Sequence, residues 1–171
     1  MYLKALCLTK FHSVLFLGDS AGGNLAAALS LRLRDMGANQ IQPKSVALIY
    51  PALQGVDFSL PSYVHNSGAA LGTAQETASV LLNYMGHSIH HSRDLIRNNH
   101  TTSQLKRDIQ PFIHINHLPE QYSHDTRIIN STFTEKPSFV EDGSSDLENS
   151  LRPNLLDPYC FPLMAKELSG L

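Results

Sequence analysis

The sequence lacks the features that mark several large classes of protein. None of its 171 residues is tryptophan, only two are cysteine, and 13 basic side chains nearly balance 15 acidic ones. It has no run of basic residues and no interleaving of basic with aromatic residues, which argues against a nucleic-acid partner. Cys7 and Cys160 lie far apart without the spacing of a zinc site. They are predicted to be buried thiols or, in an oxidising compartment, a disulfide, and the sequence does not choose between the two.

Long apolar runs are also missing. Lys4, Lys10 and His12 interrupt the first 17 residues. This stretch therefore contains neither a signal-peptide core nor the roughly 20 consecutive apolar residues that a membrane helix requires. The sequence predicts no membrane segment in this chain and leaves its location undecided.

A glycine-rich segment, Gly-Asp-Ser-Ala-Gly-Gly at residues 18–23, lies between a short apolar run and an alanine-rich stretch. Residues 14–17 are typical of a strand, and residues 24–36 carry apolar side chains at helical spacing. Gly37 is expected to cap that helix at its C-terminus. A second strand-like run, residues 45–50, ends at Pro51. The pattern predicts a strand–helix–strand unit with parallel strands.

The G-x-S-x-G spacing around Ser20 is typical of a nucleophile elbow, a sharp turn from a strand into a helix that presents a reactive serine. Gly18 and Gly22 are expected to remove side chains that would collide in the turn, and Gly23 continues the motif. The amide of Ala21, at the start of the helix, is expected to donate to a developing oxyanion.

Two alternatives to the elbow remain at this point. A glycine-rich turn before a helix can bind phosphate, but no lysine follows here and Asp19 adds negative charge, so this reading is disfavoured. A turn that only lets the helix pack closely on its strand stays open.

Three segments resemble the hormone-sensitive-lipase group of α/β-hydrolases, and within it most closely the arylacetamide deacetylase branch. They are residues 18–26, residues 48–51, and residues 155–159 with Pro162 and Leu163. The resemblance implies an α/β fold with a parallel sheet and a serine carboxylesterase, amidase or lipase. It implies a small apolar ester or amide substrate, no cofactor and no metal. The endoplasmic reticulum is the location that it suggests.

The resemblance also implies parts that this sequence does not contain. The glycine-rich oxyanion loop is expected before the nucleophile strand, and the catalytic acid and histidine are expected beyond Leu171. We therefore expect an incomplete α/β-hydrolase fold, an internal piece of a longer hydrolase with little or no turnover as an isolated chain. The alternatives are a non-catalytic small-molecule binding protein on the same fold and a truncated product without function.

The chain is interpreted as one partial domain in three parts: the elbow unit at 14–60, a cap-like and irregular region at 61–150, and an approach to the acid strand at 151–171. Residues 52–72 are predicted to be loop, and residues 134–150 are predicted to be poorly ordered. Thr73 and Glu76 resemble a capping box, which predicts a helix over 73–86. Its apolar face either lines a substrate pocket or packs in the core. The residues concerned are Leu81, Leu82, Tyr84 and Met85.

Most of the nine histidines fall between residues 86 and 125 and are predicted to be exposed loop residues. His87 and His91 have a helical metal spacing, but no acidic general base follows that pattern and Gly86 is expected to end the preceding helix, so no metal site is predicted. His124 with Asp125 is not expected to replace the missing triad partners.

Residues 140–143, Val-Glu-Asp-Gly, resemble the lead-in to a catalytic histidine, but serines follow them. They are therefore predicted to be a turn. Asn99 and Asn130 begin acceptor sequons, which permit glycosylation.

Overall fold

The computed structural model describes residues 13–37, 41–65, 72–120 and 139–169. The chain divides into two compact units. The first unit comprises Met1–Ala52 with Glu167–Leu171, and the second comprises Leu53–Lys166. The boundary after Ala52 lies earlier than the expected limit at residue 60, and residues 151–166 belong to the second unit with the cap-like region.

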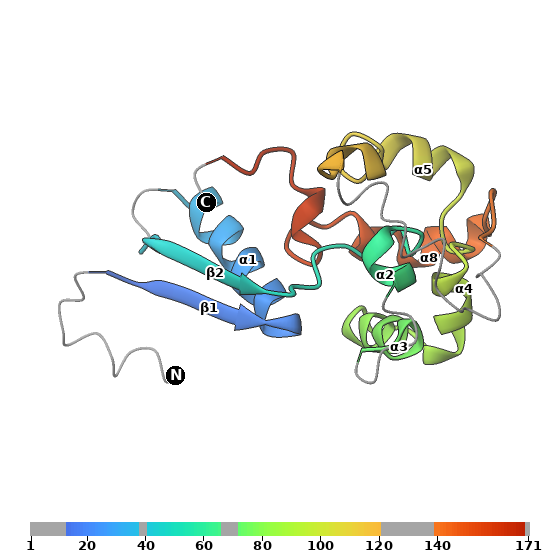
Figure 1. The fold of residues 1–171 in the computed structure, drawn as a ribbon, viewed down its shortest axis with the longest axis horizontal. Helices are drawn as coiled ribbons and strands as arrows, with labels where there is room; N and C mark the ends of the chain where they lie inside the picture. The colour runs from blue at the N-terminus through green and yellow to red at the C-terminus, as the bar shows by residue number, and fades with distance from the viewer. Residues whose placement is uncertain (1–12, 38–40, 66–71, 121–138, 170–171) are drawn as a thin grey trace. The chain divides into compact units, whose positions relative to one another are not determined.

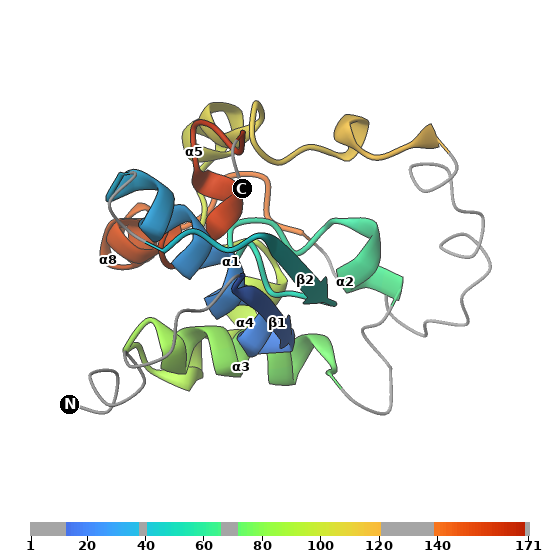
Figure 2. The ribbon, with the colours of Figure 1, turned by 90° about the vertical axis from the view of Figure 1, so that its left-hand side faces the viewer.

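The first unit contains the predicted strand–helix–strand arrangement. Strand β1 (Leu15–Asp19) leads into helix α1 (Ser20–Asp35), and β2 (Ser45–Ile49) follows. The strands pair in parallel, with Leu15 opposite Ser45 and Asp19 opposite Ile49. Figures 1 and 2 show the two strands side by side with α1 beside them. Gly37 has a φ of 90° and its amide donates to the carbonyl of Arg34, so it closes α1 as predicted.

Helix α1 buries mainly small side chains, together with Leu31, and exposes Leu25 and Leu29. Leu25, Leu29 and Met36 are 57%, 45% and 57% exposed. The spacing of the apolar residues therefore predicted the helix correctly, but most of these residues lie on its exposed side. Small residues on the other side let the helix approach a neighbour closely. The buried residues of α1 are Gly23, Asn24, Ala26, Ala27, Ala28, Ser30 and Leu31.

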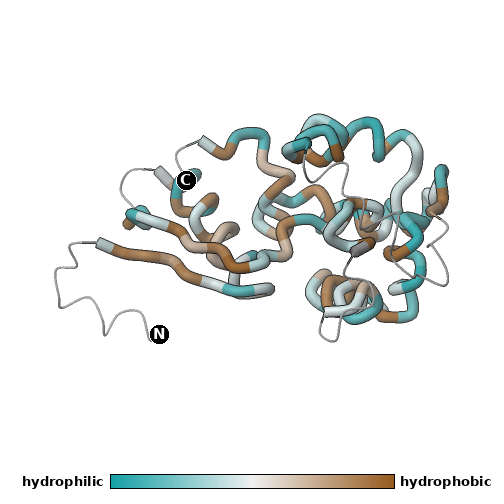
Figure 3. Tube along the Cα trace, in the orientation of Figure 1, coloured by the Kyte–Doolittle hydropathy of each residue, from teal (hydrophilic) through white to brown (hydrophobic). Residues whose placement is uncertain are grey.

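One face of the two-stranded sheet is apolar and uncovered by the described residues. Leu15, Leu17 and Ile49 are 63%, 66% and 47% exposed and share one side of the paired strands. Figure 3 shows that both strands are apolar along most of their length. Parallel sheets are usually covered on both faces, so this face has the composition of a buried surface.

The second unit is built mainly from short helices. Helix α2 (Pro61–His65) lies in a region predicted to be loop, and that prediction is wrong for these residues. Helix α8 (Ser145–Leu155) begins inside the region predicted to be poorly ordered, so that prediction is also wrong from residue 145 onward. The described residues of the unit also form three further helices and three 3₁₀ turns. They are α3 (Ala74–Tyr84), α4 (Ser92–Ile96), α5 (Ser103–Ile109), Ile89–His91, Ile115–His117 and Pro162–Met164.

Helix α3 begins with the predicted capping box. The Glu76 amide donates to Thr73 Oγ1 over 3.2 Å, and the Thr73 amide donates to Glu76 Oε2 over 3.0 Å. These bonds satisfy amides at the start of the helix and fix where it begins. The Thr73 amide and hydroxyl, which both donate to the Glu76 carboxylate, lower the pKa of Glu76.

The second unit has its own apolar core. Phe161 is fully buried, and a Cβ on Gly55 would come within 2.7 Å of its ring, so only glycine lets the backbone pass there. The residue before Gly55, Gln54, is buried and accepts hydrogen bonds from the amides of Val56 and Asp57. Other core side chains come from several helices. They are Leu82, Leu95, Leu105, Leu151 and Leu155.

Candidate functional site

Ser20 lies at the junction of β1 and α1. It is the first residue of the helix, directly after the last residue of the strand, and it is exposed. Its φ is 49°, in the left-handed region that residues with a side chain rarely adopt. The strained strand-to-helix turn predicted from the G-x-S-x-G spacing is therefore present, and a sharp strained turn of this kind is what exposes a nucleophilic serine.

The neighbouring glycines differ in why they are needed. A Cβ on Gly18 would lie 2.1 Å from the carbonyl oxygen of Gly22, and a Cβ on Gly23 would lie 2.9 Å from Pro51 Cβ. A Cβ on Gly22 would have Asp19 Oδ1, at 3.9 Å, as its nearest contact. The prediction that Gly22 avoids a collision is therefore wrong, because no described residue would come into close contact with a side chain there. The close contacts are at Gly18 and Gly23.

Hydrogen bonds from the segment after β2 hold the elbow. The buried Asn24 side chain donates from Nδ2 to the carbonyl of Ala52 over 2.7 Å. The Ala52 amide donates to the carbonyl of Ser20 over 3.4 Å. The Tyr50 hydroxyl donates to Asp19 Oδ2 over 3.2 Å, and this hydrogen bond and the Asp19 charge raise the pKa of Tyr50. Sequence reasoning missed Asn24 and Tyr50, although an asparagine on a small-residue helix face was a visible signal.

The amide of Ala21 lies in the first turn of α1. The first four N–H groups of an α-helix have no partner within the helix, and Ala21 is the second residue of α1. No acidic side chain occupies the first turn itself, although Asp19 lies at the N-cap. The exposed Ser20 hydroxyl and a backbone amide without a helical partner thus lie next to each other.

A general base is not present beside Ser20 in the described part of the first unit. That part contains no histidine. The nearest carboxylate in sequence, Asp19, already accepts the hydrogen bond from Tyr50. The sequence-derived pair His124 and Asp125 lies outside the described residues.

Comparison with known protein families gives a match that covers most of the first unit. The sequence profile described as the alpha/beta hydrolase fold matches residues 5–115 of this chain. That match includes β1, α1, β2 and the whole Ser20 turn.

The chain belongs to the α/β-hydrolase fold family.

Its relatives include esterases and deacetylases of this family. Neutral cholesterol ester hydrolase 1 of Pongo abelii is 30% identical over 152 residues, which is 88% of this chain and 35% of that protein. Arylacetamide deacetylase of Mus musculus is 31% identical over 150 residues, with the same shares of 88% and 35%. The bovine arylacetamide deacetylase is 56% identical over 50 residues, or 29% of this chain and 12% of that protein.

These relatives confirm the resemblance to the hormone-sensitive-lipase group and to arylacetamide deacetylase. This α/β-hydrolase chain spans about a third of the length of the relatives that it matches along most of its own length. No solved structure is significantly similar to it. In the described residues no helix has the length and apolar character needed to span a bilayer.

The histidines of this α/β-hydrolase chain do not all lie in exposed loops. His100 is fully buried, and its Nε2 lies 2.9 Å from the carbonyl oxygen of Gly55. The prediction is therefore wrong for His100. Burial lowers its pKa. His91 lies on a 3₁₀ turn with Nδ1 3.1 Å from Asp94 Oδ2. Within the described ranges, no three or more side chains of histidine, cysteine, aspartate or glutamate are grouped as a metal site would need.

The predicted pocket residues on α3 are mostly core residues. Leu81, Leu82 and Met85 are 5%, 0% and 6% exposed, whereas Tyr84 is 47% exposed. Asn99, one of the two sequon asparagines, donates from Nδ2 to Asp94 Oδ1 and precedes the buried His100. The remaining sequence-derived candidates, Asn130 and Cys7, lie outside the described residues.

Cys160 is buried, and burial followed by the nearby charge of Asp157 raises the pKa of its thiol to about 11. The thiol is therefore protonated at neutral pH. Where a turn was predicted at residues 140–143, the structure has a bend at residues 141 and 142. This segment is hydrogen-bonded to the residues before α5. The Val140 amide donates to the carbonyl of Arg97, and the Gly143 amide donates to that of Thr101.

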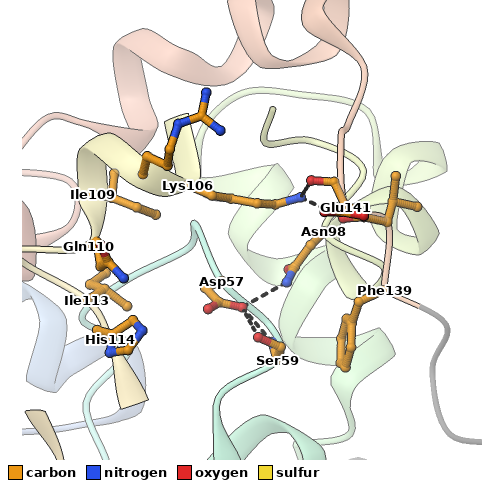
Figure 4. Close-up of a pocket in the computed structure, with 12 residues that line it drawn as sticks. Asp57, Ser59, Asn98, Lys106, Ile109, Gln110, Ile113, His114, Phe139 and Glu141 are labelled. Atoms are coloured by element: carbon orange, nitrogen blue, oxygen red, sulfur yellow. Dashed lines mark hydrogen bonds between the residues drawn. The ribbon is translucent and has the colours of Figure 1, made fainter. Parts of the chain in front are cut away.

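The second unit also contains a pocket that sequence reasoning missed. Its volume is about 370 Å³, and its lining combines charged and apolar side chains from separate parts of the unit (Figure 4). No motif signalled it, because its residues come together only through folding. They include Asp57, Asn98, Lys106, Ile109, Ile113, His114 and Phe139.

Proposed function

We propose that Ser20 is the nucleophile of a serine hydrolase that cleaves carboxylic esters or amides with small apolar acyl groups. The observation that carries the proposal is the exposed Ser20 at a φ of 49°, between a parallel strand and the start of a helix. The names of the relatives, a cholesterol ester hydrolase and an arylacetamide deacetylase, agree with cleavage at an acyl carbonyl.

The chemistry follows from the geometry of the turn. Ser20 Oγ attacks the carbonyl carbon, its proton passes to a base, and the carbonyl oxygen becomes an oxyanion that accepts a hydrogen bond from the Ala21 amide. Collapse of the tetrahedral intermediate expels the alcohol or amine, which takes up that proton, and leaves an acyl group on Ser20. Attack by water then releases the acid and restores the hydroxyl.

The rate at which Ser20 reacts depends on a base that accepts its proton. Because the described part of the first unit has no histidine, we propose that Ser20 reacts slowly in the isolated chain. The oxyanion donor and the positioning of substrate account for residual reactivity, since both contribute to catalysis without a triad.

The test is labelling with a fluorophosphonate, followed by mass spectrometry of the modified peptide. We expect slow modification of Ser20 that added imidazole accelerates. The Ser20→Ala variant should lose it. Ser30→Ala is the matched control, because Ser30 is a buried serine on the same helix whose hydroxyl donates to the carbonyl of Ala26. It should keep the labelling.

Two outcomes would contradict separate parts of the proposal. Adducts distributed over other serines, with no preference for Ser20, would overturn the nucleophile assignment. Rapid stoichiometric labelling without imidazole that disappears in Ser20→Ala would support the nucleophile but overturn the slow reaction.

A non-catalytic small-molecule binding protein is the second candidate function. The pocket in the second unit favours it, since that pocket needs no catalytic partner from elsewhere. Saturable binding of an apolar ester without any labelling of Ser20 would support this candidate over the hydrolase. Absence of a cooperative unfolding transition would instead support a truncated product without function.

A further inference from the structure

The pocket of the second unit has walls that are fixed by hydrogen bonds. Asp57 Oδ1 accepts from the Ser59 amide over 2.7 Å and from Asn98 Nδ2 over 2.8 Å. On the other side, Lys106 Nζ donates to the carbonyls of Val140 and Glu141 over 2.6 and 2.9 Å. Figure 4 shows these hydrogen bonds, with Ile113 and His114 opposite Asp57. A site held in this way loses little conformational freedom when a ligand binds.

The pocket retains hydrogen-bonding capacity that the fold does not use. Asp57 Oδ2 accepts no hydrogen bond from the described residues, and Figure 4 shows this oxygen on the open side of the pocket, toward Ile113 and His114. An ionised carboxylate oxygen is a strong acceptor, so it favours a ligand that brings an N–H or O–H donor.

The charges along the pocket cancel. Its lining includes Asp57 and Glu141 on the acidic side and Lys106 and Arg107 on the basic side. A ligand with a net charge would be attracted by one pair and repelled by the other, and it would also have to lose its hydration shell. A neutral ligand avoids both costs.

Apolar side chains form another part of the lining, which also includes the polar side chains of Gln110 and His114. Ile109 and Ile113 are 5% and 6% exposed, and Phe139 contributes a ring that is 39% exposed. A volume of about 370 Å³ lies near the lower end of small-molecule sites. The site therefore fits a small apolar body with a single polar group.

We propose that this pocket binds a small neutral alcohol. Its hydroxyl donates to Asp57 Oδ2, and its apolar body lies against Ile109, Ile113 and Phe139. A hydroxyl suits the site because one atom can donate to the carboxylate and accept from the donors around it, without adding charge.

The experiment uses 2-phenylethanol as the probe and its methyl ether as the matched compound, with amide chemical shifts of the whole chain as the readout. The ether keeps the aromatic body and the acceptor oxygen but has no donor. We expect shifts in residues 109–114 and 139–141, and affinity for the alcohol roughly tenfold higher than for the ether, because a hydrogen bond to a charged group is lost. 2-Phenylethylamine and 3-phenylpropionate should bind more weakly than the alcohol.

The variant Asp57→Asn tests the acceptor. An amide NH₂ that faces the pocket donates to an alcohol or an ether oxygen, so Asp57→Asn should bind the two probes almost equally. Asp108→Asn is the matched control, since Asp108 is an exposed carboxylate on the same helix as Lys106 and does not line the pocket. It should retain the preference for the alcohol.

Several results would overturn the proposal. They are the absence of shifts in the wild-type chain, shifts confined to residues elsewhere, equal affinity of the wild type for alcohol and ether, and a preference that persists in Asp57→Asn. The comparison of alcohol with ether needs no variant, so it decides the matter even if Asp57→Asn does not fold.

Discussion

At Gly18 the backbone of β1 passes so close to the start of α1 that no side chain fits between them. A Cβ there would meet the Gly22 carbonyl oxygen at 2.1 Å and the Gly23 amide nitrogen at 2.7 Å. Both are backbone atoms and cannot turn away. We expect Gly18→Ala to lower the free energy of unfolding by about 3 kcal/mol or more, at the upper end of overpacking effects. Urea unfolding followed by far-ultraviolet circular dichroism measures this.

Gly22→Ala is the matched control for Gly18→Ala. Its Cβ would find no atom closer than 3.9 Å, and the residue lies in the first turn of α1. Alanine has a higher helix propensity than glycine, so the variant should be as stable as the wild type or up to about 1 kcal/mol more stable. If both variants lost stability equally, the close contact at Gly18 would not be the reason that this position requires glycine.

Residues near Ser20 were predictable to the extent that their role is local in sequence. The turn, the parallel pairing and the position of the Ala21 amide follow from spacing over a few residues. Asn24 was not predictable in this way, because its hydrogen-bond acceptor, the Ala52 carbonyl, lies 28 residues away. Spacing around Ser20 also could not reveal that Gly23, rather than Gly22, meets Pro51.

At the scale of elements, helices α1 and α3 were predictable, whereas α8, which is as long as α3, and the shorter helices were not. Helices α4 and α5 have five and seven residues, too few for the apolar spacing to repeat clearly. Local and remote contacts meet at the start of α5. Thr102 Oγ1 accepts from the Leu105 amide as a local N-cap. The Thr102 amide donates to the buried carboxylate of Glu148 on α8 over 2.7 Å, a contact between residues 46 positions apart that sequence spacing could not reveal.

His100 joins the segment before α5 to the segment at residues 55–58. We expect this contact to make the stability of the second unit depend on pH. It is buried, bonded to the Gly55 carbonyl and edge-on to the ring of Phe58 at 6.1 Å between centroids. Burial is the main reason that its pKa is lowered, and the positive charge of Lys106 adds to this, whereas Asp57 acts in the opposite direction. The folded chain therefore holds His100 neutral where the unfolded chain begins to protonate it.

The sign of the pH effect follows from this difference. Above the ordinary histidine pKa of about 6.5 both states are neutral at His100 and its contribution is complete. As the pH falls below that value the unfolded state binds the extra proton, so the free energy of unfolding falls, by up to about 1.4 kcal/mol per pH unit. Urea unfolding at pH values between 5 and 8 should show this decline.

Two variants assign the decline to His100. In His100→Gln the slope between pH 5 and 6.5 should be smaller, whatever the stability at pH 8. His90→Gln removes an exposed histidine in the same unit and should leave the slope unchanged. A wild-type slope retained in His100→Gln would mean that other groups titrate in this range.

At the scale of the whole molecule, the sequence predicted the fold family and the incomplete sheet but not the division into two units. Family and sheet depend on the local elbow pattern, whereas the boundary after Ala52 depends on which residues contact one another. The two-stranded sheet also has an apolar face that the described residues leave uncovered. Apolar strands of this kind are normally buried on both sides, and here Leu15, Leu17 and Ile49 face solvent.

Because an exposed apolar patch promotes association, we expect the chain to self-associate through this sheet face. Leu17→Lys places a charge at its most exposed leucine, at 66% exposure, and should reduce the concentration-dependent rise in mean mass measured by sedimentation. Val80→Lys is the control: Val80 is 56% exposed, but it lies on α3 in the second unit. If the control reduced association as much as Leu17→Lys, net charge rather than the sheet face would be responsible, since both variants gain one positive charge.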